Sequence, residues 1–457
     1  MSESPHSLLP EGLGARVEAE TGARIATVRP RGGGGASREG AELTLDWPDG
    51  RRLECYMNYD VNKAGAGDDA AFLKEAAILR ELSGPLADSG VRTAPFVTAI
   101  PELRALVTGR VAGESRFVLA GDADAQMAVA RDFMAQLARL HAIDISRVEG
   151  LGAARPLREE ALARIARTRG FARRNGNDPL IHLALDWLEE NVPAEPERQV
   201  IVHGDAGPSN FMFADGEVTA LLDWELVHFG DPMADLAMIC LRCLFQSFVP
   251  LPDAFAAYEE AGGAPVDLGR VRYWRLLFQS GFAGRMSLDD PDAPPPPNLG
   301  MNMVYKMVHR KVLAEALAEA MSMDLPPVSL PDAPETPHAR SFAIALDDLR
   351  DVIVPRLPDQ QASVKAKGLA RLVKWWRDLD RYGPAFDTAE LAEISHALGT
   401  PFATVGEARA ALADAVAGRR IDRTVALRLV HAQVTRETRI MADAMGSLAR
   451  TAFLPLA

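Results

Sequence analysis

The chain is predicted to be an α+β protein, with a β-rich region first, a mainly helical region next and an all-α region last. Three observations predict this order. Short runs rich in β-branched and apolar residues, bounded by turn residues, occupy the N-terminal hundred residues. From about Asp122 the apolar residues recur every three or four positions, as on one face of a helix. A proline cluster, Pro326 to Pro337, precedes a last region with the same helical period.

The N-terminal region is expected to form a small antiparallel sheet that carries one helix. The expected strands are residues 24–28, 41–47, 52–59, 96–100 and 103–108. Pro48-Asp49-Gly50 is a turn signal between two of them, and Pro101 divides the last two. Asp69 to Leu82 reads as the helix, because its apolar residues share one face.

Four segments follow from these changes of pattern. They are a β-rich lobe (1–111), a helical lobe (112–325), a Pro-rich linker (326–337) and an all-helical accessory domain (338–457). Because the linker interrupts the helical pattern on both sides, we expect a chain ending near Pro337 to fold without the accessory domain. The accessory domain shows no ligand cluster, and either packing on the preceding lobe or a homodimer surface would suit it.

Composition excludes some classes of partner. The formal net charge is −13, so we expect no nucleic-acid binding and no adhesion to an anionic membrane. The N-terminus lacks a basic segment followed by an apolar one, and three cysteines cannot form a disulfide framework. A cytoplasmic location is therefore expected.

The segment from Val202 to Leu236 holds the residues that indicate chemistry. Asp205 and Asn210 stand five residues apart, and Asp223 follows after a hairpin signal centred on Asp215-Gly216. Closing that hairpin brings Asn210 and Asp223 together. A carboxamide oxygen and a carboxylate suit Mg²⁺, and Asp205 is placed to accept a proton from a hydroxyl group. Phosphoryl transfer of the kinase type needs these parts, and protein kinases show a similar spacing.

The motifs together resemble the aminoglycoside phosphotransferase and choline kinase family. The matching pieces are His203-Gly204-Asp205 with Asn210, Asp223-Trp224-Glu225, and Gly230-Asp231-Pro232 with Asp235-Leu236. The resemblance covers about residues 25–323. It implies a bilobal protein-kinase-like fold, with ATP or GTP bound between the lobes and a γ-phosphoryl group transferred to a hydroxyl of a small molecule.

The same resemblance assigns roles to individual residues. It makes Asp205 the catalytic base, Asn210 and Asp223 the Mg²⁺ ligands, and Glu225 a supporting or acceptor-side carboxylate. For His203, Asp231 and Asp235 we favour structural roles, with the first and last holding the loop and Asp231 capping a helix before Pro232.

The residues expected to bind the nucleotide are indicated by weaker sequence signals. Glycines allow a backbone to approach phosphate, so the run Gly33, Gly34 and Gly35, with Ser37, is expected at the tip of a phosphate-covering hairpin. By position in the family, Thr108, Gly109 and Arg110 would form the hinge that contacts the base. Glu75 would pair with a basic strand residue.

One position departs from the family. No Lys or Arg stands near Met57 or Asn58, where that strand residue belongs, and Lys63 is the nearest substitute. The leading hypothesis is a kinase acting on a metabolite, a hydroxyacyl thioester or an antibiotic-like alcohol. The missing residue keeps open a non-catalytic nucleotide-binding regulator. A protein kinase is disfavoured, because Asp223 to Gly230 leaves little room for an activation segment.

Overall fold

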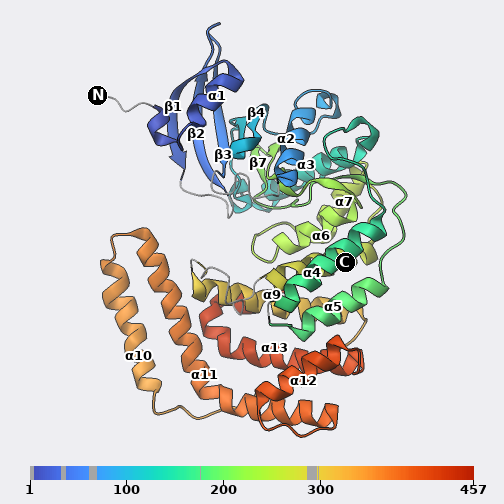
Figure 1. Cartoon of the computed structure of the whole chain (residues 1–457), viewed down its shortest axis with the longest axis vertical. Coiled ribbons are helices and arrows are strands. Elements are labelled where there is room, and N and C mark those ends of the chain that lie inside the picture. Colours follow the sequence, from blue (N-terminus) through green and yellow to red (C-terminus); the bar gives the residue numbers. More distant parts are fainter. Residues whose placement is uncertain (1–4, 32–37, 61–68, 175, 286–295, 297) are drawn as a thin grey trace. The chain divides into compact units, whose positions relative to one another are not determined.

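The computed structural model describes residues 5–31, 38–60, 69–174, 176–285, 296 and 298–457. The contacts divide the chain into two compact units, whose elements are labelled in Figure 1. Unit 1 comprises Met1–Leu157, Glu195–Val271 and Leu454–Ala457, and unit 2 comprises Arg158–Ala194 and Arg272–Phe453.

A five-stranded antiparallel sheet forms the first part of unit 1, in the order β1-β2-β3-β5-β4. Its strands are β1 (Arg24–Arg31), β2 (Glu39–Asp46), β3 (Arg52–Tyr59), β4 (Phe96–Ile100) and β5 (Ala105–Gly109). Side chains alternate across β2 and β3, so Leu43, Leu45 and Met57 enter one core. Helix α1 (Leu13–Thr21), absent from the expectations, adds Leu13 and Val17 to that core.

Helix α2 (Ala70–Leu82) begins one residue after the expected start and ends where expected. It buries Phe72, Ile78 and Leu79, which lie at helical spacing on one face. Glu75 is buried on this helix as well, with 4% of its surface exposed. A carboxylate at that depth requires a charged partner.

The remainder of unit 1 is mainly helical, with two small two-stranded sheets, β6-β9 and β7-β8. Its elements are α3 (Ala123–Ala142), β6 (Val200–Val202), β7 (Phe211–Ala214), β8 (Glu217–Leu221), β9 (His228–Gly230), α6 (Met233–Arg242) and α7 (Leu251–Glu260). The expected α+β class, with a β-rich region before a helical one, is confirmed.

Unit 2 is described only by helices and the segments between them. They are α4 (Leu157–Arg174), α5 (Pro179–Glu190), α8 (Leu268–Arg285, mostly in this unit), α9 (Leu299–Ala320), α10 (Ala339–Asp347), α11 (Gln360–Leu398), α12 (Val405–Ala417) and α13 (Arg423–Met445). The expected all-α region after Pro337 is thereby confirmed. Residues 323–336 contain neither helix nor strand, as the proline cluster predicts.

Helices α9 and α13 share a core within unit 2. Val304 and Val308 of α9 pack with Met441 and Met445 of α13. Arg310 of α9 is also buried, and it forms ion pairs with Asp178 and Glu437. Segments on both sides of the expected linker therefore depend on the same core, although the four domain boundaries remain predictions.

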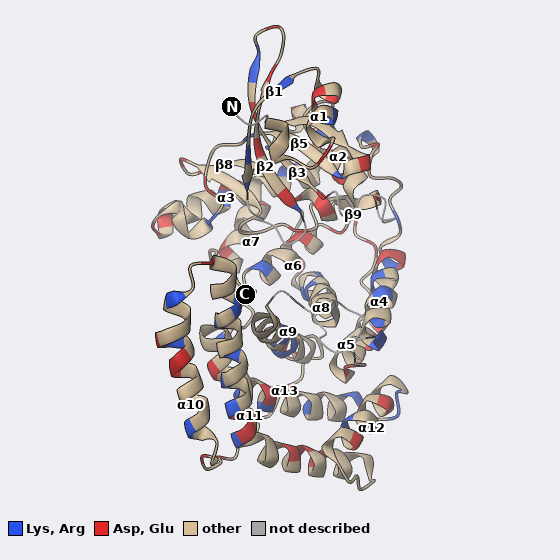
Figure 2. Cartoon of the chain, turned by 60° about the vertical axis from the view of Figure 1, so that its left-hand side comes forward, with Lys and Arg blue, Asp and Glu red and all other residues tan. Residues whose placement is uncertain are grey.

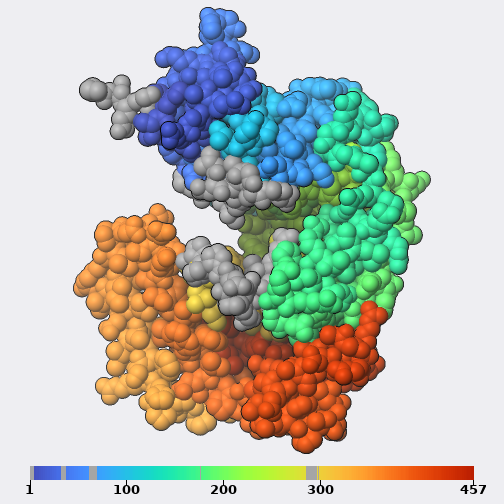
Figure 3. Space-filling model, viewed as in Figure 1, coloured from blue at the N-terminus to red at the C-terminus, as the bar shows by residue number. Residues whose placement is uncertain are grey.

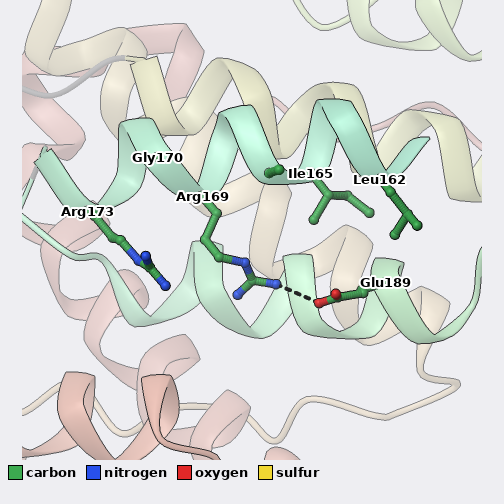
Figure 4. Close-up of a pocket in the computed structure, with 7 residues that line it drawn as sticks. Leu162, Ile165, Arg169, Gly170, Arg173 and Glu189 are labelled. Atoms are coloured by element: carbon green, nitrogen blue, oxygen red, sulfur yellow. Dashed lines mark hydrogen bonds and ion pairs between the residues drawn. The ribbon is translucent and has the colours of Figure 1, made fainter. Parts of the chain in front are cut away.

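The exposed side chains of unit 2 differ in charge and polarity from one helix to another. Both basic and acidic residues occur along α10 and α11, and up to Arg377 the charged residues of α11 are all basic (Figure 2). The segment that is coloured orange in Figure 3 has several exposed apolar side chains, namely Ile344, Val352, Val364, Leu369 and Trp376. A pocket of about 400 Å³ lies against α4 and α5, where Leu162 and Ile165 meet Arg169 and Glu189 (Figure 4). None of the expected site residues lines that pocket.

Among the described residues, no helix combines the length and the apolar character needed to cross a membrane.

Candidate active site

The loop after β6 presents Asp205, and its backbone requires glycine. Gly204 has a φ of 85°, and a Cβ there would lie 2.3 Å from the carbonyl oxygen of Leu226. Only glycine meets both conditions without strain. The loop therefore turns sharply directly before Asp205.

Asp235 of α6 fixes this loop from beneath. Its carboxylate accepts hydrogen bonds from the N–H groups of His203 and Gly204, both at 2.8 Å, and from Nε2 of His141 at 3.0 Å. Burial raises the pKa of Asp235, but the bond from His141 and the charges and N–H groups around it outweigh burial, so its pKa lies below the usual value. These contacts support the structural role favoured for Asp235.

His203 also faces the protein interior. Its Nδ1 accepts a hydrogen bond from the N–H of Asp205 at 3.3 Å, and its ring lies 4.5 Å from that of Trp224. Burial lowers the pKa of His203, which favours a neutral ring. These contacts fit a residue that holds the loop in place.

Asn210 lies beside Asp205 in the structure. The Asn210 amide donates to the Asp205 carbonyl oxygen at 2.8 Å and to its Oδ2 at 2.9 Å. Because both bonds use the amide nitrogen, the carbonyl oxygen Oδ1 of Asn210 remains as an acceptor for another group. Asn210 would bind Mg²⁺ through this Oδ1 atom.

The hairpin between Asn210 and Asp223 forms as expected. Strands β7 and β8 pair through a turn at Asp215 and Gly216, whose φ angles are 51° and 83°. At the open end, the N–H of Leu222 donates to the carbonyl of Asn210 at 2.9 Å. Asp223 follows directly in the left-handed region, with a φ of 66°. The two proposed metal ligands, Asn210 and Asp223, thus lie at the same end of one hairpin.

The electrostatics around Asp223 favour a bound cation. Burial, followed by the charges of Glu225, Asp205 and Glu75, raises the pKa of Asp223 to about 7. A divalent cation would relieve this repulsion, and carboxylate and amide oxygens are the donors that Mg²⁺ prefers. The described residues contain no group of three or more His, Cys, Asp or Glu that could hold a metal. Two protein ligands completed by phosphate oxygens are typical of nucleotide-bound Mg²⁺.

Arg242, the last residue of α6, binds the carboxylate of Asp205 and was not anticipated from the sequence. Its Nε donates to Oδ1 at 2.9 Å, and its Nη2 donates to Oδ2. Gly207 makes room for it, because a Cβ there would lie 2.9 Å from Cδ of Arg242. A sequence signal existed: Asp235 and Arg242 are seven residues apart, so they share a face of α6.

Arg38 is the second basic residue that the sequence analysis missed. Its Nη1 lies 2.7 Å from Oε2 of Glu75, and its Nη2 lies 3.8 Å from Oε2 of Glu225. Glu75 therefore has a basic partner, but that partner precedes β2 and does not belong to β3. Lys63 lies outside the described residues, as do Gly33, Gly34, Gly35 and Ser37.

The expected hinge lies at the end of β5. Thr108 pairs with Tyr56, and the N–H groups of Gly109 and Arg110 donate to the carbonyls of Pro95 at 2.7 Å and Glu54 at 2.8 Å. Those two N–H groups are therefore committed to the sheet. A base bound here would have to use other backbone groups of the segment.

The structure places Asp231 at the start of α6. Its Oδ1 accepts from the N–H of Met233 at 3.0 Å, and its Oδ2 accepts from Nε of Arg270 at 2.8 Å. Capping of this kind satisfies an N–H group at the helix start. The contacts support the structural role favoured for Asp231.

Comparison with known proteins covers part of the chain. Residues 63–274 match a family model described as "Phosphotransferase enzyme family". Acyl-CoA dehydrogenase family member 11 of Rattus norvegicus is 35% identical over 82 residues, which are 18% of this chain and 10% of that protein. Family member 10 of Mus musculus is 38% identical over 79 residues, 17% of this chain and 7% of that protein. The chain thus matches about a tenth of the length of these relatives.

Two solved structures also resemble the chain. Macrolide 2'-phosphotransferase MphH from Brachybacterium faecium is 21% identical, with a TM-score of 0.44, over 71% of this chain and 99% of that one. A thermostable mutant of aminoglycoside phosphotransferase APH(4)-Ia, in a ternary complex with ADP and hygromycin B, is 16% identical, with a TM-score of 0.47, over 68% of this chain and 97% of that one. From the match of the family model, the chain contains a domain of the phosphotransferase enzyme family at residues 63–274.

Proposed function

We propose that the protein transfers the γ-phosphoryl group of ATP or GTP to a hydroxyl group of a small molecule. The observation that carries the proposal is the convergence of Asp205, Asn210 and Asp223. Asn210 hydrogen-bonds Asp205 directly, and the hairpin brings Asp223 to the same end as Asn210. A base, an amide oxygen and a carboxylate in one place are the parts that this reaction needs.

In the proposed reaction, Asp205 orients the acceptor hydroxyl and accepts its proton. The hydroxyl oxygen forms a bond to the γ-phosphorus, and the bond from that phosphorus to the bridging oxygen of the β-phosphate breaks. The products are a phosphorylated acceptor and a nucleoside diphosphate. Asp205 releases the proton to solvent afterwards. Positioning and charge stabilisation account for most of the rate in this class of reaction.

Asn210 and Asp223 would hold Mg²⁺ through their side-chain oxygens. When bound, the ion supplies positive charge next to the phosphate oxygens. Without it, the carboxylates of Asp205, Asp223 and Glu225 would repel the nucleotide. Burial, followed by the charges of Glu225 and Asp205, raises the pKa of Asp223 to about 7.

For the acceptor, we propose a hydroxyacyl thioester as the first compound class to test. The support is the similarity to proteins named acyl-CoA dehydrogenase family members 10 and 11. Because the similar segment is short, other metabolites and antibiotic-like alcohols belong in the same panel.

The test is a turnover assay with purified protein, ATP or GTP, and pooled hydroxylated compounds that include hydroxyacyl-CoA thioesters and aminoglycosides. Acceptor-dependent release of nucleoside diphosphate in the presence of Mg²⁺, abolished by EDTA, is the expected result. Nucleotide binding without turnover on any acceptor would instead favour the non-catalytic regulator. The ground for that alternative was the absence of a basic residue near Met57 and Asn58 of β3, and Arg38 beside Glu75 weakens it.

A further inference from the structure

The side chain of Arg38 is largely buried, whereas most arginine side chains lie at the protein surface. Only 11% of its side chain is exposed, and its guanidinium group lies 5.8 Å from the ring centroid of Phe72 on α2. Glu75, its partner at 2.7 Å, has a side chain that is 5% exposed. A buried cation of this kind must be balanced by anionic groups.

The anionic groups around Arg38 belong to the candidate active site. Its second terminal nitrogen faces Glu225, which directly follows the Asp223-Trp224 pair. Burial raises the pKa of Glu75, as does the charge of Glu225, whereas Arg38 and Arg104 lower it. Arg38 therefore joins α2 to the proposed metal-binding segment.

The register of the sheet shows where Arg38 lies relative to β3. Met57 is fully buried in the core on one side of the sheet. Asn58 points to the opposite side, where its partner across the strands is Gly40. A Cβ on Gly40 would lie 2.2 Å from the hydroxyl of Tyr56, so a larger residue there would displace the Tyr56 side chain. Arg38 stands two residues before Gly40, directly before the start of β2, and contacts Glu75 from there.

We infer that Arg38 is the residue that binds the nucleotide phosphates, held in position by Glu75, in place of a basic residue on β3. The inference rests on the proposed function. Guanidinium groups have five N–H donors and can bond two phosphate oxygens at once, so a pairing with Glu75 leaves donors for a phosphate group.

The experiment compares the binding of MgATP with that of adenosine by calorimetric titration. Arg38→Ala should weaken MgATP binding by about 10- to 100-fold, since a charge-assisted hydrogen bond is lost, and should leave adenosine binding within about twofold. Arg38→Lys should fall between wild type and Arg38→Ala. Arg24→Ala is the matched control, because Arg24 is an exposed arginine of the same sheet, 3.7 Å from Asp46.

A relocation variant tests the idea of replacement directly. Adding Asn58→Lys to Arg38→Ala returns a cation to β3 on the same side of the sheet, so it should recover at least about tenfold in MgATP affinity. Melting temperatures are measured for every variant. If Arg38→Ala unfolds, Arg38→Gln, which retains most of the side-chain length, takes its place.

The outcomes separate this inference from the proposed function. Unchanged MgATP affinity in the Arg38 variants, or an equal loss for adenosine, would overturn the inference while leaving turnover by the wild type intact. Arg38-dependent binding of MgATP in a protein without phosphoryl transfer would support the inference and contradict the proposed function.

Discussion

Arg242 holds both carboxylate oxygens of Asp205, the residue proposed to receive the acceptor hydroxyl. The two groups come from segments 37 residues apart, and Gly207 leaves the space in which they meet. Bidentate pairs of this kind fix the direction of a carboxylate as well as its charge. Asp205 is thus oriented by hydrogen bonds from both Arg242 and Asn210.

Loss of the bidentate pair between Arg242 and Asp205 should slow the reaction more than it weakens nucleotide binding. For Arg242→Ala we expect kcat to fall by about 10- to 100-fold, because a misplaced Asp205 carboxylate slows the chemical step. The KM for ATP should stay within about threefold of the wild-type value. Arg242→Lys retains the charge but cannot form the bidentate pair, so it should lie between. Steady-state kinetics measure both constants.

Arg131→Ala provides the control for loss of an arginine, since Arg131 forms an exposed ion pair with Glu260. A higher kcat in Arg242→Ala would contradict the orienting role. It would mean that Arg242 restrains Asp205 and must release it before reaction.

Asp235 should matter for folding. Asp235→Ala leaves the N–H groups of His203 and Gly204 buried without their acceptor, so we expect a loss of about 3–5 kcal/mol in the free energy of unfolding. Asp253→Ala, a change at an exposed carboxylate on α7, should cost less than about 1 kcal/mol. Urea denaturation measures both, and equal losses would show that Asp235 does not support the loop.

The lowered pKa of the Asp235 carboxylate predicts that the stability of the protein depends on pH. The pKa of Asp235 lies below its usual value in the folded protein, so its contribution to stability is present above the unfolded pKa and is lost as pH falls through the folded one. The stability difference between wild type and Asp235→Ala should therefore shrink below about pH 4. A difference that grows in acid would contradict the direction of the shift.

The core shared by α9 and α13 changes the expectation for a shortened chain. A chain ending at Pro337 loses α13 and Glu437, which exposes Val304 and Val308 and leaves Arg310 without one of its two partners. Burial of each such apolar side chain is worth about 1.5–3 kcal/mol, so we now expect this chain to be less stable than the whole protein. Thermal melting and soluble yield are the measurements, and an unchanged melting temperature would restore the simple linker interpretation.

The sequence predicted the parts of the fold that depend on local patterns. Runs of β-branched and apolar residues bounded by turn residues located the strands of the sheet. The Asp215-Gly216 signal located the hairpin that brings Asn210 next to the segment of Asp223. Arg38 and Arg242 were missed for a different reason. Each contacts a carboxylate on another element, and such a contact depends on how elements pack, which neither periodicity nor turn chemistry reports.

The central claim is that Asp205 receives the acceptor hydroxyl while Asp223 holds the metal. Asp205→Asn and Asp223→Ala are compared by calorimetric titration of ATP with and without Mg²⁺, alongside steady-state turnover. We expect Asp205→Asn to retain Mg²⁺-dependent ATP affinity while turnover falls by about 10²–10⁴-fold. Asp223→Ala should lose the Mg²⁺-dependent part of ATP binding together with turnover. An equal loss of Mg²⁺-dependent binding in both variants, or full turnover in Asp205→Asn, would contradict the account.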